Sequence, residues 1–210
     1  MSSTQTTIQL IQQPDNSLLG ETHVAFLKNL GGPSWITIEG KDRTRRRVVV
    51  TLLHGNEPSG LHAVHRLLKE GVQPETDLGI LVAAADAALY EPILSHRYIP
   101  GEQDLNRCFR SPYTTNQGEL AAKILDIIHD FNPEGLIDTH NTSSHSEAFS
   151  IAAHKTIENA GLASLFTDSL IILDQNLGTL LEKLDSSIPA ITVEFGGFMD
   201  PNADWLARES

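Results

Sequence analysis

Hydrophobic and polar positions along the chain follow two different periods, which predict strands interleaved with helices. The apolar, β-branched run at residues 48–53 comes after a charged stretch and indicates a buried strand. Residues 59–70 instead carry apolar side chains at helical spacing, and Gly71 closes the segment. Residues 118–131 repeat the helical pattern, which Asn132-Pro133 ends.

The other elements continue this alternation. Strands are predicted at residues 8–11, 35–39, 48–53, 78–85, 135–140, 149–153, 170–173 and 189–195, and helices at residues 59–70, 87–94, 118–131, 156–165 and 177–184. Strands that alternate with helices of this length predict an α/β layer fold with a mostly parallel central sheet. The strands at 35–39 and 48–53 flank a charged turn and suggest a hairpin, which would make the sheet mixed.

The length of 210 residues fits one domain, which we place at residues 21–210. Residues 1–20 are rich in Ser, Thr and Gln and predict a partly ordered N-terminal arm. The connection at residues 95–116 has almost no periodicity, and such long loops in compact domains are usually functional or disordered.

The formal net charge of -12 argues against a nucleic-acid partner. The one basic run, at residues 43–47, is interpreted as a solvated turn before a strand, with an anion-binding patch as the alternative.

The cysteine content and the apolar runs indicate a cytoplasmic protein. The single cysteine, Cys108, excludes a disulfide framework and a cysteine-based zinc cluster. Met1 is followed by polar residues without the pattern of a signal peptide. No apolar run approaches the length that crosses a bilayer, so we expect no membrane partner.

Candidate chemistry begins at His54-Gly55-Asn56-Glu57, where the buried strand gives way to a loop and a helix. An imidazole and a carboxylate three residues apart can converge on one divalent cation, and the alternative is a loop histidine with a helix-capping glutamate. His140 ends the strand at 135–140 in the same way. Two histidines and one glutamate form the donor set of a catalytic zinc that keeps a position for water, and nickel or cobalt suits the same donors.

A general base and an anion clamp are also present. Glu194 ends an apolar strand, where a carboxylate is costly unless it is hydrogen-bonded or functional; the alternative is a capping or salt-bridged glutamate. Asn106 and Arg107 stand together in the long loop, and Arg97 precedes them; guanidinium groups bind carboxylates and stabilise oxyanions, although structural ion pairs are the common use. His62 and His65 could form a second metal pair, but a surface role is favoured.

Four ordered motifs carry a family resemblance. They are HGNE at 54–57, DLNR followed by Cys108-Phe109, DTHNT at 138–142 and VEFGG at 193–197. Together they resemble the succinylglutamate desuccinylase/aspartoacylase family of zinc carboxypeptidase-like amidohydrolases, over residues 45–200.

The resemblance implies a carboxypeptidase-type, three-layer α/β/α sandwich around a mixed sheet of about eight strands. It implies a role for each candidate: zinc ligands His54, Glu57 and His140, general base Glu194, a carboxylate clamp of Asn106 and Arg107, carbonyl polarisation by Arg97, and pocket lining by Asn141 and Thr142.

The chain departs from this family in three respects. The loop from Arg97 to Asp104 is about two residues longer than in typical aspartoacylases, by the resemblance. The second carboxylate-reading arginine is missing, and Lys183 is the nearest replacement, without the bidentate fork. Family members carry a C-terminal domain that narrows the site, whereas this chain ends at Ser210. These departures argue against dicarboxylate substrates.

The leading hypothesis is a zinc-dependent hydrolase that cleaves an amide next to a carboxylate and deacylates an N-acyl amino acid or similar small molecule. A metal-bound water would be the nucleophile and Glu194 the base. The alternatives are a zinc carboxypeptidase for short peptides and a metal- or carboxylate-binding protein without turnover. Absence of a GxSxG motif disfavours a serine hydrolase. The sequence does not determine the oligomeric state, and a homo-oligomer is one of the alternatives.

Overall fold

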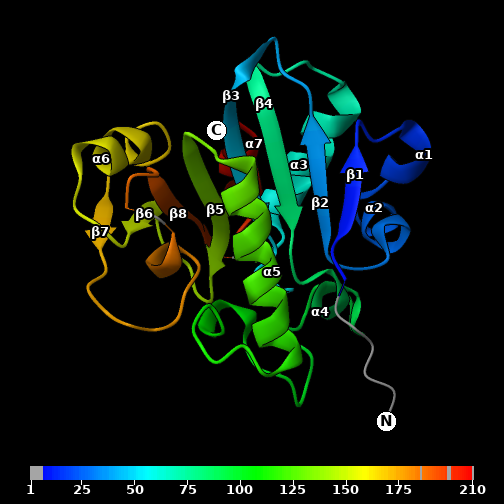
Figure 1. Ribbon diagram of the computed structural model, residues 1–210. Coiled ribbons are helices and arrows are strands. Elements are labelled where there is room, and N and C mark those ends of the chain that lie inside the picture. Colours follow the sequence, from blue (N-terminus) through cyan, green and yellow to red (C-terminus); the bar gives the residue numbers. More distant parts are fainter. Residues whose placement is uncertain (1–6, 185, 198–199, 210) are drawn as a thin grey trace.

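A mixed sheet of eight strands with helices on both faces forms the centre of the computed structural model, which describes residues 7–184, 186–197 and 200–209 (Figure 1). The strands are β1 (Gln9–Gln12), β2 (Ser34–Ile38), β3 (Asp42–Thr51), β4 (Thr76–Val82), β5 (Gly135–Thr142), β6 (Phe149–Ala152), β7 (Leu170–Ile172) and β8 (Ala190–Gly197). Their order is β1-β2-β4-β3-β5-β8-β6-β7, and only the β2/β4 and β6/β8 pairs are antiparallel. The predicted α/β fold with a mostly parallel, mixed sheet is confirmed.

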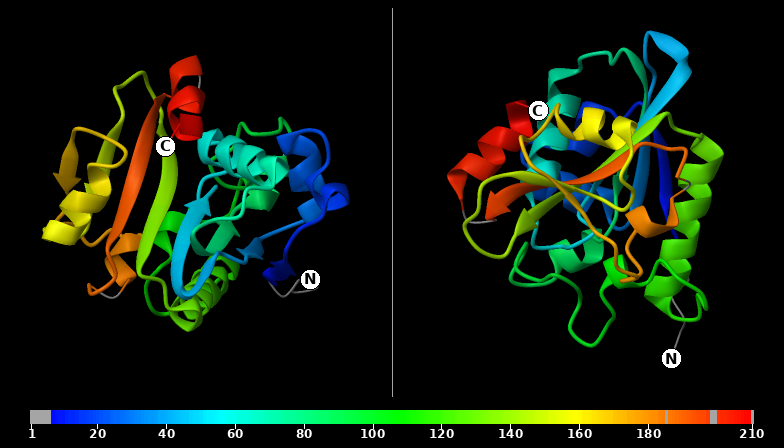
Figure 2. Two further views of the ribbon diagram at one scale, coloured as in Figure 1. Left: turned by 90° about the horizontal axis from the view of Figure 1, so that it is seen from above. Right: turned by 90° about the vertical axis from the view of Figure 1, so that its left-hand side faces the viewer.

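Seven α-helices and two 3₁₀ turns are described. They are α1 (Asn16–Leu19), α2 (His23–Leu30), α3 (Ser59–Glu70), α4 (Ala85–Leu89), α5 (Asn116–Phe131), α6 (Ile157–Ala163) and α7 (Pro201–Glu209), with the 3₁₀ turns η1 (Leu105–Arg107) and η2 (Leu181–Lys183). Helix α5 covers one face of the sheet, and α2, α3 and α7 lie on the other (Figure 2). None of the described helices has the length and apolar character needed to span a membrane.

Alternation along the strands divides the core between the two faces. On β3, Val48 and Val50 pack in one cluster with Ile124 of α5, whereas Val49 between them packs against the cluster of Leu61 of α3. A third cluster, on the face of α3, joins β8 to α6 and α7. Side chains of one strand serve both faces because successive residues point to opposite sides.

The predicted hairpin is wrong, because β4 lies between β2 and β3. Strand β2 pairs antiparallel with β4, and β3 pairs parallel with the other edge of β4. Gly40 N donates to Asp77 Oδ1 and Lys41 N to Pro74 O, so the charged turn crosses over the start of β4. The two segments are adjacent in sequence but are separated in space by a strand that comes later in the chain.

The predicted helix at 177–184 is also wrong, since only the short turn η2 forms there. Gly178 has φ +78, outside the helical region, and Glu182 accepts hydrogen bonds from Leu177 N and Gly178 N. Helices α2 and α7 were not predicted. The N-terminal segment contributes β1 and α1, while residues 1–6 of the predicted arm lie outside the described part.

The basic run lies within strand β3 rather than in a turn. Arg45 Nε and Arg47 Nε each lie 2.8 Å from a carboxylate oxygen of Glu134, and Arg43 pairs with Glu39. These ion pairs offset much of the positive charge of the run.

Candidate metal centre and active site

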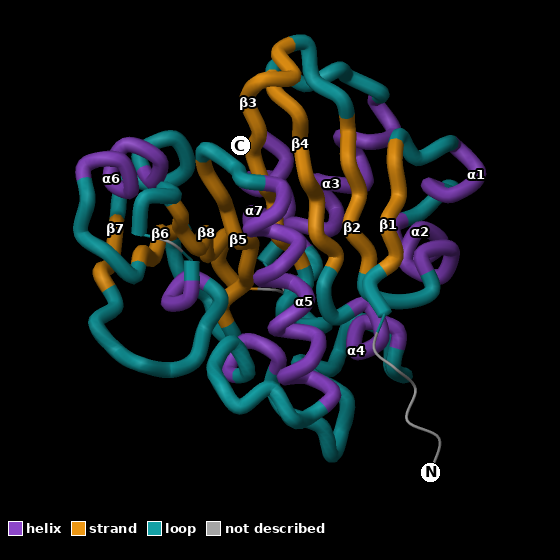
Figure 3. The backbone as a smooth tube through the Cα atoms, viewed as in Figure 1, coloured by secondary structure: helices purple, strands orange, loops and turns teal. Residues whose placement is uncertain are grey.

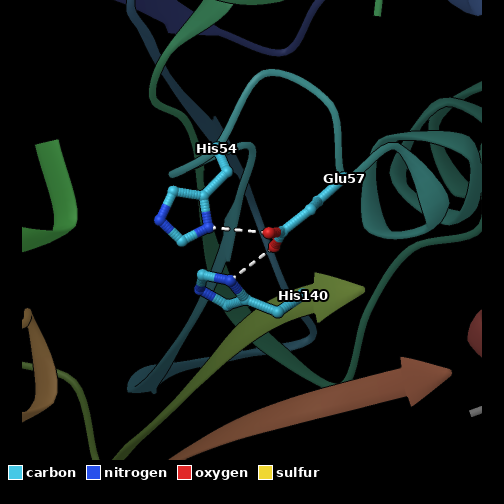
Figure 4. A group of neighbouring side chains, drawn as sticks. All are labelled: His54, Glu57 and His140. Carbon is cyan, nitrogen blue, oxygen red and sulfur yellow. Dashed lines mark hydrogen bonds and ion pairs between the residues drawn. The ribbon is translucent and has the colours of Figure 1, made fainter. Parts of the chain in front are cut away.

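His54, Glu57 and His140 converge at the edge of the sheet where the parallel strands β3, β5 and β8 have their carboxyl ends. One ligand atom from each lies within 4.8 Å of the others. Glu57 stands between the two imidazoles, with Oε1 2.9 Å from His54 Nδ1 and Oε2 2.6 Å from His140 Nδ1 (Figure 4). All three residues are buried.

The loop that carries His54 and Glu57 depends on close backbone packing. A Cβ atom on Gly55 would lie 2.5 Å from Ala88 N and 2.7 Å from His96 O. Gly55 N also donates to Arg97 O, which ties the loop to the long connection after α4. Glu57 is placed immediately before α3, so its carboxylate faces the end of β5.

Two carboxylates that the sequence analysis did not single out support the histidines. Asp104 Oδ1 lies 3.2 Å from His54 Nε2, and Asp138 Oδ2 lies 2.9 Å from His140 Nε2. Each ring therefore presents Nδ1 to the centre and is held from behind by a carboxylate, as is usual for metal-binding histidines. A signal was present, because Asp138 is an acidic residue that follows the apolar start of the strand and precedes His140 by two positions.

The charges keep Glu57 in the ionised state that a metal requires and favour a proton on His140, which a metal ion would displace on binding. Burial by itself would raise the pKa of Glu57, but His140 and His54 hold that pKa far below its usual range. Burial opposes protonation of His140, whereas the charges of Asp138 and Glu57 raise its pKa well above the ordinary value. A buried, ionised glutamate between two imidazoles is a favourable site for a cation.

The donors fit a divalent ion. Nδ1 of His54 is buried and, although close to Glu57, makes no hydrogen bond with any described residue. A metal ion at this point would satisfy that nitrogen together with His140 and Glu57. The donor set of two imidazoles and one carboxylate matches zinc sites that keep an open position.

Glu194 lies directly beside His140, its register partner on the neighbouring strand β8. Burial raises the pKa of the Glu194 carboxyl, an effect that the charge of Glu57 strengthens and the charge of His140 opposes. Its Oε2 atom is buried without a hydrogen-bond partner among the described residues. Glu194 also forms no ion pair with a lysine, arginine or histidine in the part of the chain that the structure describes.

A cavity of about 330 Å³ opens in front of these groups. All nine site residues predicted from the sequence line it: His54, Glu57, Arg97, Asn106, Arg107, His140, Asn141, Thr142 and Glu194. The cavity is therefore the place where residues from four distant motifs meet.

The two predicted arginines differ in their partners. Arg97 lies 3.3 Å from Glu57 Oε1 and 2.9 Å from Asp104 Oδ2, so its charge is shared with two acidic groups at the metal centre. Arg107 donates to the carbonyl of Asn106 at 2.6 Å and pairs with no carboxylate in the described part of the chain. Arg107 is thus the better placed of the two to receive an external anion.

The polar residues around the cavity are partly engaged by the protein. Asn106 Oδ1 accepts from Leu180 N, which fixes its amide against the loop after β7. Asn141 bonds through both ends of its amide, to Ser59 and to the Gly196 carbonyl. Thr142 donates to Ser144 O at 2.6 Å.

Several other side chains line the cavity without having been predicted. Ile151, Leu173 and Leu177 are apolar, and Glu182 is acidic. Lys183, the expected replacement for a second arginine, is exposed and is not among the lining residues. His62 and His65 lie apart from the cavity, bonded to Asp204 and to the Leu19 carbonyl; the two do not share a ligand position.

Residues 44–208 match the family model of the Succinylglutamate desuccinylase/Aspartoacylase catalytic domain. The chain belongs to this family. The resemblance carried by the four motifs is thereby confirmed, and all four lie within the matched region. Among curated proteins, a search finds no match to the chain.

Solved structures share the fold. The succinylglutamate desuccinylase from Chromobacterium violaceum superimposes with a TM-score of 0.62 at 20% identity, over 81% of this chain and 63% of that chain. A succinylglutamate desuccinylase/aspartoacylase from Rhodobacter sphaeroides gives 0.63 at 16% identity, over 82% and 54%. A metallo-carboxypeptidase from Pseudomonas aeruginosa gives 0.61 at 12% identity, over 82% and 56%. The predicted carboxypeptidase-type fold is confirmed, and the chain spans less than two thirds of the length of these three structures.

Proposed function

We propose that the protein is a metal-dependent hydrolase that cleaves an amide bond next to a carboxylate, most simply by deacylating an N-acyl amino acid or a similar small molecule. The observation that carries the proposal is the pairing of Glu194 with His140 across β5 and β8, beside the His-Glu-His cluster and inside one cavity with Arg107. Membership of the succinylglutamate desuccinylase/aspartoacylase family supports the same chemistry.

His54, Glu57 and His140 would hold the metal ion, with zinc as the best fit to the donors and nickel or cobalt as the other candidates. A bound zinc ion supplies Lewis acidity, which polarises a carbonyl and makes water a nucleophile at neutral pH. Asp104 and Asp138 orient the two rings from behind.

The protein's own residues perform the remaining tasks. Arg107, with Asn106 beside it, binds the substrate carboxylate and so aligns the amide with the metal centre. Arg97 stabilises negative charge on the carbonyl oxygen during attack. Glu194 takes a proton from the attacking water, whose oxygen bonds to the acyl carbon. As the carbon–nitrogen bond breaks, Glu194 passes that proton to the leaving amine.

The Glu194→Gln variant tests this proposal. Gln keeps the size of the side chain but cannot accept a proton, so turnover of N-acyl amino acids should fall by about 10²–10⁴-fold while zinc content stays unchanged. Glu147→Gln, in the exposed loop between β5 and β6, is the matched control and should retain full activity. Unchanged turnover in the Glu194→Gln variant would contradict the proposed mechanism.

Substrate and metal are identified in the same assays. Elemental analysis of protein purified without added metal identifies the ion, and a chelator should abolish activity that zinc restores. Dipeptides tested beside N-acyl amino acids separate deacylation from the carboxypeptidase alternative. If the protein contains no metal, and added metal restores hydrolysis of neither N-acyl amino acids nor dipeptides, the result favours a binding protein without turnover.

A further inference from the structure

One wall of the cavity is apolar, and it comes from the part of the sheet farthest from β3. Ile151 on β6, Leu173 after β7 and Leu177 in the following loop all line the cavity and are only partly buried. Apolar side chains that remain accessible inside a cavity are favourable surfaces for an apolar group of a ligand.

Strand register places this wall opposite the polar centre. Ile151 pairs with Thr192 on β8, and Thr192 pairs with Asp138 on β5, so the three side chains stand in one row across the sheet. Neighbouring strands are about 4.8 Å apart, which puts Ile151 about 10 Å from the strand that carries the ligand His140. An acyl amino acid at the metal centre can therefore reach the wall with a short apolar group.

The loop between β7 and β8 brings the apolar wall next to the arginine clamp. Figure 3 shows this loop turning back toward η1, where Gly178 O accepts from Phe109 N. A Cβ atom on Gly178 would lie 2.7 Å from the carbonyl oxygen of Arg107, so Leu177 and Arg107 belong to one tightly packed corner.

The charges around the cavity suit a ligand that has one carboxylate group. Arg97 is already paired with Glu57 and Asp104, which leaves Arg107 as the lining cation that has no acidic partner among the described residues. Glu182 also lines the cavity, and its carboxylate is fixed by the backbone N–H groups of Leu177 and Gly178. A second carboxylate of a ligand in this corner would meet a fixed negative charge.

We propose that the substrate carries a single carboxylate, bound at Arg107, and an apolar group that packs against Ile151, Leu173 and Leu177. The substrate class is an N-acyl amino acid with an apolar side chain or acyl chain, and dicarboxylates such as N-acyl aspartate are poor ligands. The identity of the reaction rests on the proposed function, whereas the binding preference is measured without turnover.

Calorimetric titration of the zinc-loaded Glu194→Gln protein measures that preference. N-acetylleucine should bind about tenfold or more tightly than N-acetylaspartate, with N-acetylglycine in between. Of these three compounds, only N-acetylleucine has an apolar side chain that packs against the wall. N-hexanoylglycine is the second probe, which shows whether the apolar group belongs to the acyl chain. N-acetylaspartate bound as tightly as both apolar probes, or no binding of either apolar probe, would overturn the inference.

The Ile151→Thr substitution, made in the Glu194→Gln protein, tests whether the apolar wall causes the binding preference. Thr keeps the β-branched shape on the strand, so affinity for the apolar probe should fall about fivefold while affinity for N-acetylglycine stays. Ile172→Thr, on β7 and outside the cavity wall, is the control and should change neither affinity. Leu177→Ser is a second wall variant with the same expected loss, and equal affinities in all four proteins would also overturn the inference. Hydrolysis by the protein with Glu194 intact is assayed separately, so a failure of the proposed reaction is distinguishable from a failure of the binding preference.

Discussion

Asp138 Oδ2 lies 2.9 Å from Nε2 of His140, while Nδ1 of the same ring faces Glu57 at 2.6 Å. The imidazole is therefore fixed between two carboxylates that come from different strands and loops. Asp138 is 1% exposed, and Thr192 Oγ1 donates to the same oxygen at 3.4 Å. The orientation of a proposed metal ligand thus depends on a residue that does not touch the metal position.

Asp138→Asn should weaken zinc binding by about 10–100-fold, because the amide loses the charge that orients and polarises the ring. Competition with a chromogenic chelator measures this affinity. Asp77→Asn is the control, since Asp77 is also a buried aspartate near the start of a strand but holds Gly40 N at the other end of the sheet. Equal zinc affinity in the two variants would contradict the role of Asp138.

Removal of the metal should lower thermal stability. Binding to the folded state alone contributes about 4 kcal/mol at a metal concentration a thousand times the Kd, which for a chain of this size corresponds to about 10 °C in Tm. Calorimetry before and after chelation, and after zinc is returned, measures the shift. Glu57→Gln should show little or no zinc response, and a full response in that variant would exclude Glu57 as a ligand.

Gly55→Ala should destabilise both the fold and the metal site. The added methyl group would approach Ala88 N at 2.5 Å and Ala87 C at 2.6 Å, and backbone atoms cannot move aside at low cost. We expect a loss of about 1–3 kcal/mol in urea unfolding, with weaker zinc binding. Gly161→Ala in α6 is the control, because a Cβ there meets no atom within 4 Å; it should be neutral or stabilising. Similar losses in both variants would refute the packing argument.

Stability should fall as the pH drops below neutrality, in part through His23. Burial, followed by the charges of His62 and His65, lowers the pKa of His23 from 6.5 to about 4. The unfolded chain therefore takes up a proton at a pH where the folded protein does not. The contribution of His23 to stability is present in full above pH 6.5, decreases as the pH falls toward 4 and is lost below pH 4.

His23→Gln isolates this contribution in urea unfolding at pH 7 and pH 5. Because the ring is only partly buried, solvent screening reduces the effect, and we expect the wild-type protein to lose about 1 kcal/mol more than the variant between these pH values. His129→Gln, an exposed residue in the last turn of α5, serves as the control. Parallel pH dependence in the His23 variant and the wild-type protein would contradict the prediction.

Local patterns were sufficient to predict the positions around the proposed metal centre. His140 and Glu194 lie on neighbouring parallel strands, and His54 follows a third, so the rule that carboxyl ends of parallel strands share one edge brought them together. The position of β4 between β2 and β3 could not be predicted, because the residue pattern of a strand does not indicate which distant strand it pairs with. Adjacent segments therefore suggested a hairpin that does not exist.

The remaining errors have similar causes. Leu177, Leu180 and Leu184 have the spacing of an amphipathic helix. However, the positive φ of Gly178 and the hydrogen bonds that Glu182 accepts from two backbone N–H groups hold the segment in another conformation. Helix α2 could have been found from its capping residue Thr22 and the terminating Gly31. Apolar residues of the cavity wall look like core residues in the sequence, since periodicity does not show whether an apolar face meets the protein or a ligand.

The register between β5 and β8 makes the site sensitive to changes in chain length. His140 stands beside Glu194, and the next residues inward, Thr139 and Val193, point to the opposite face. A one-residue insertion within β8 would turn Glu194 into the core and bring Val193 or Phe195 to the cavity. Insertions in the long connection before α5 leave this register unchanged, but they displace residues that line the cavity or hold His54 from behind, such as Arg107 and Asp104.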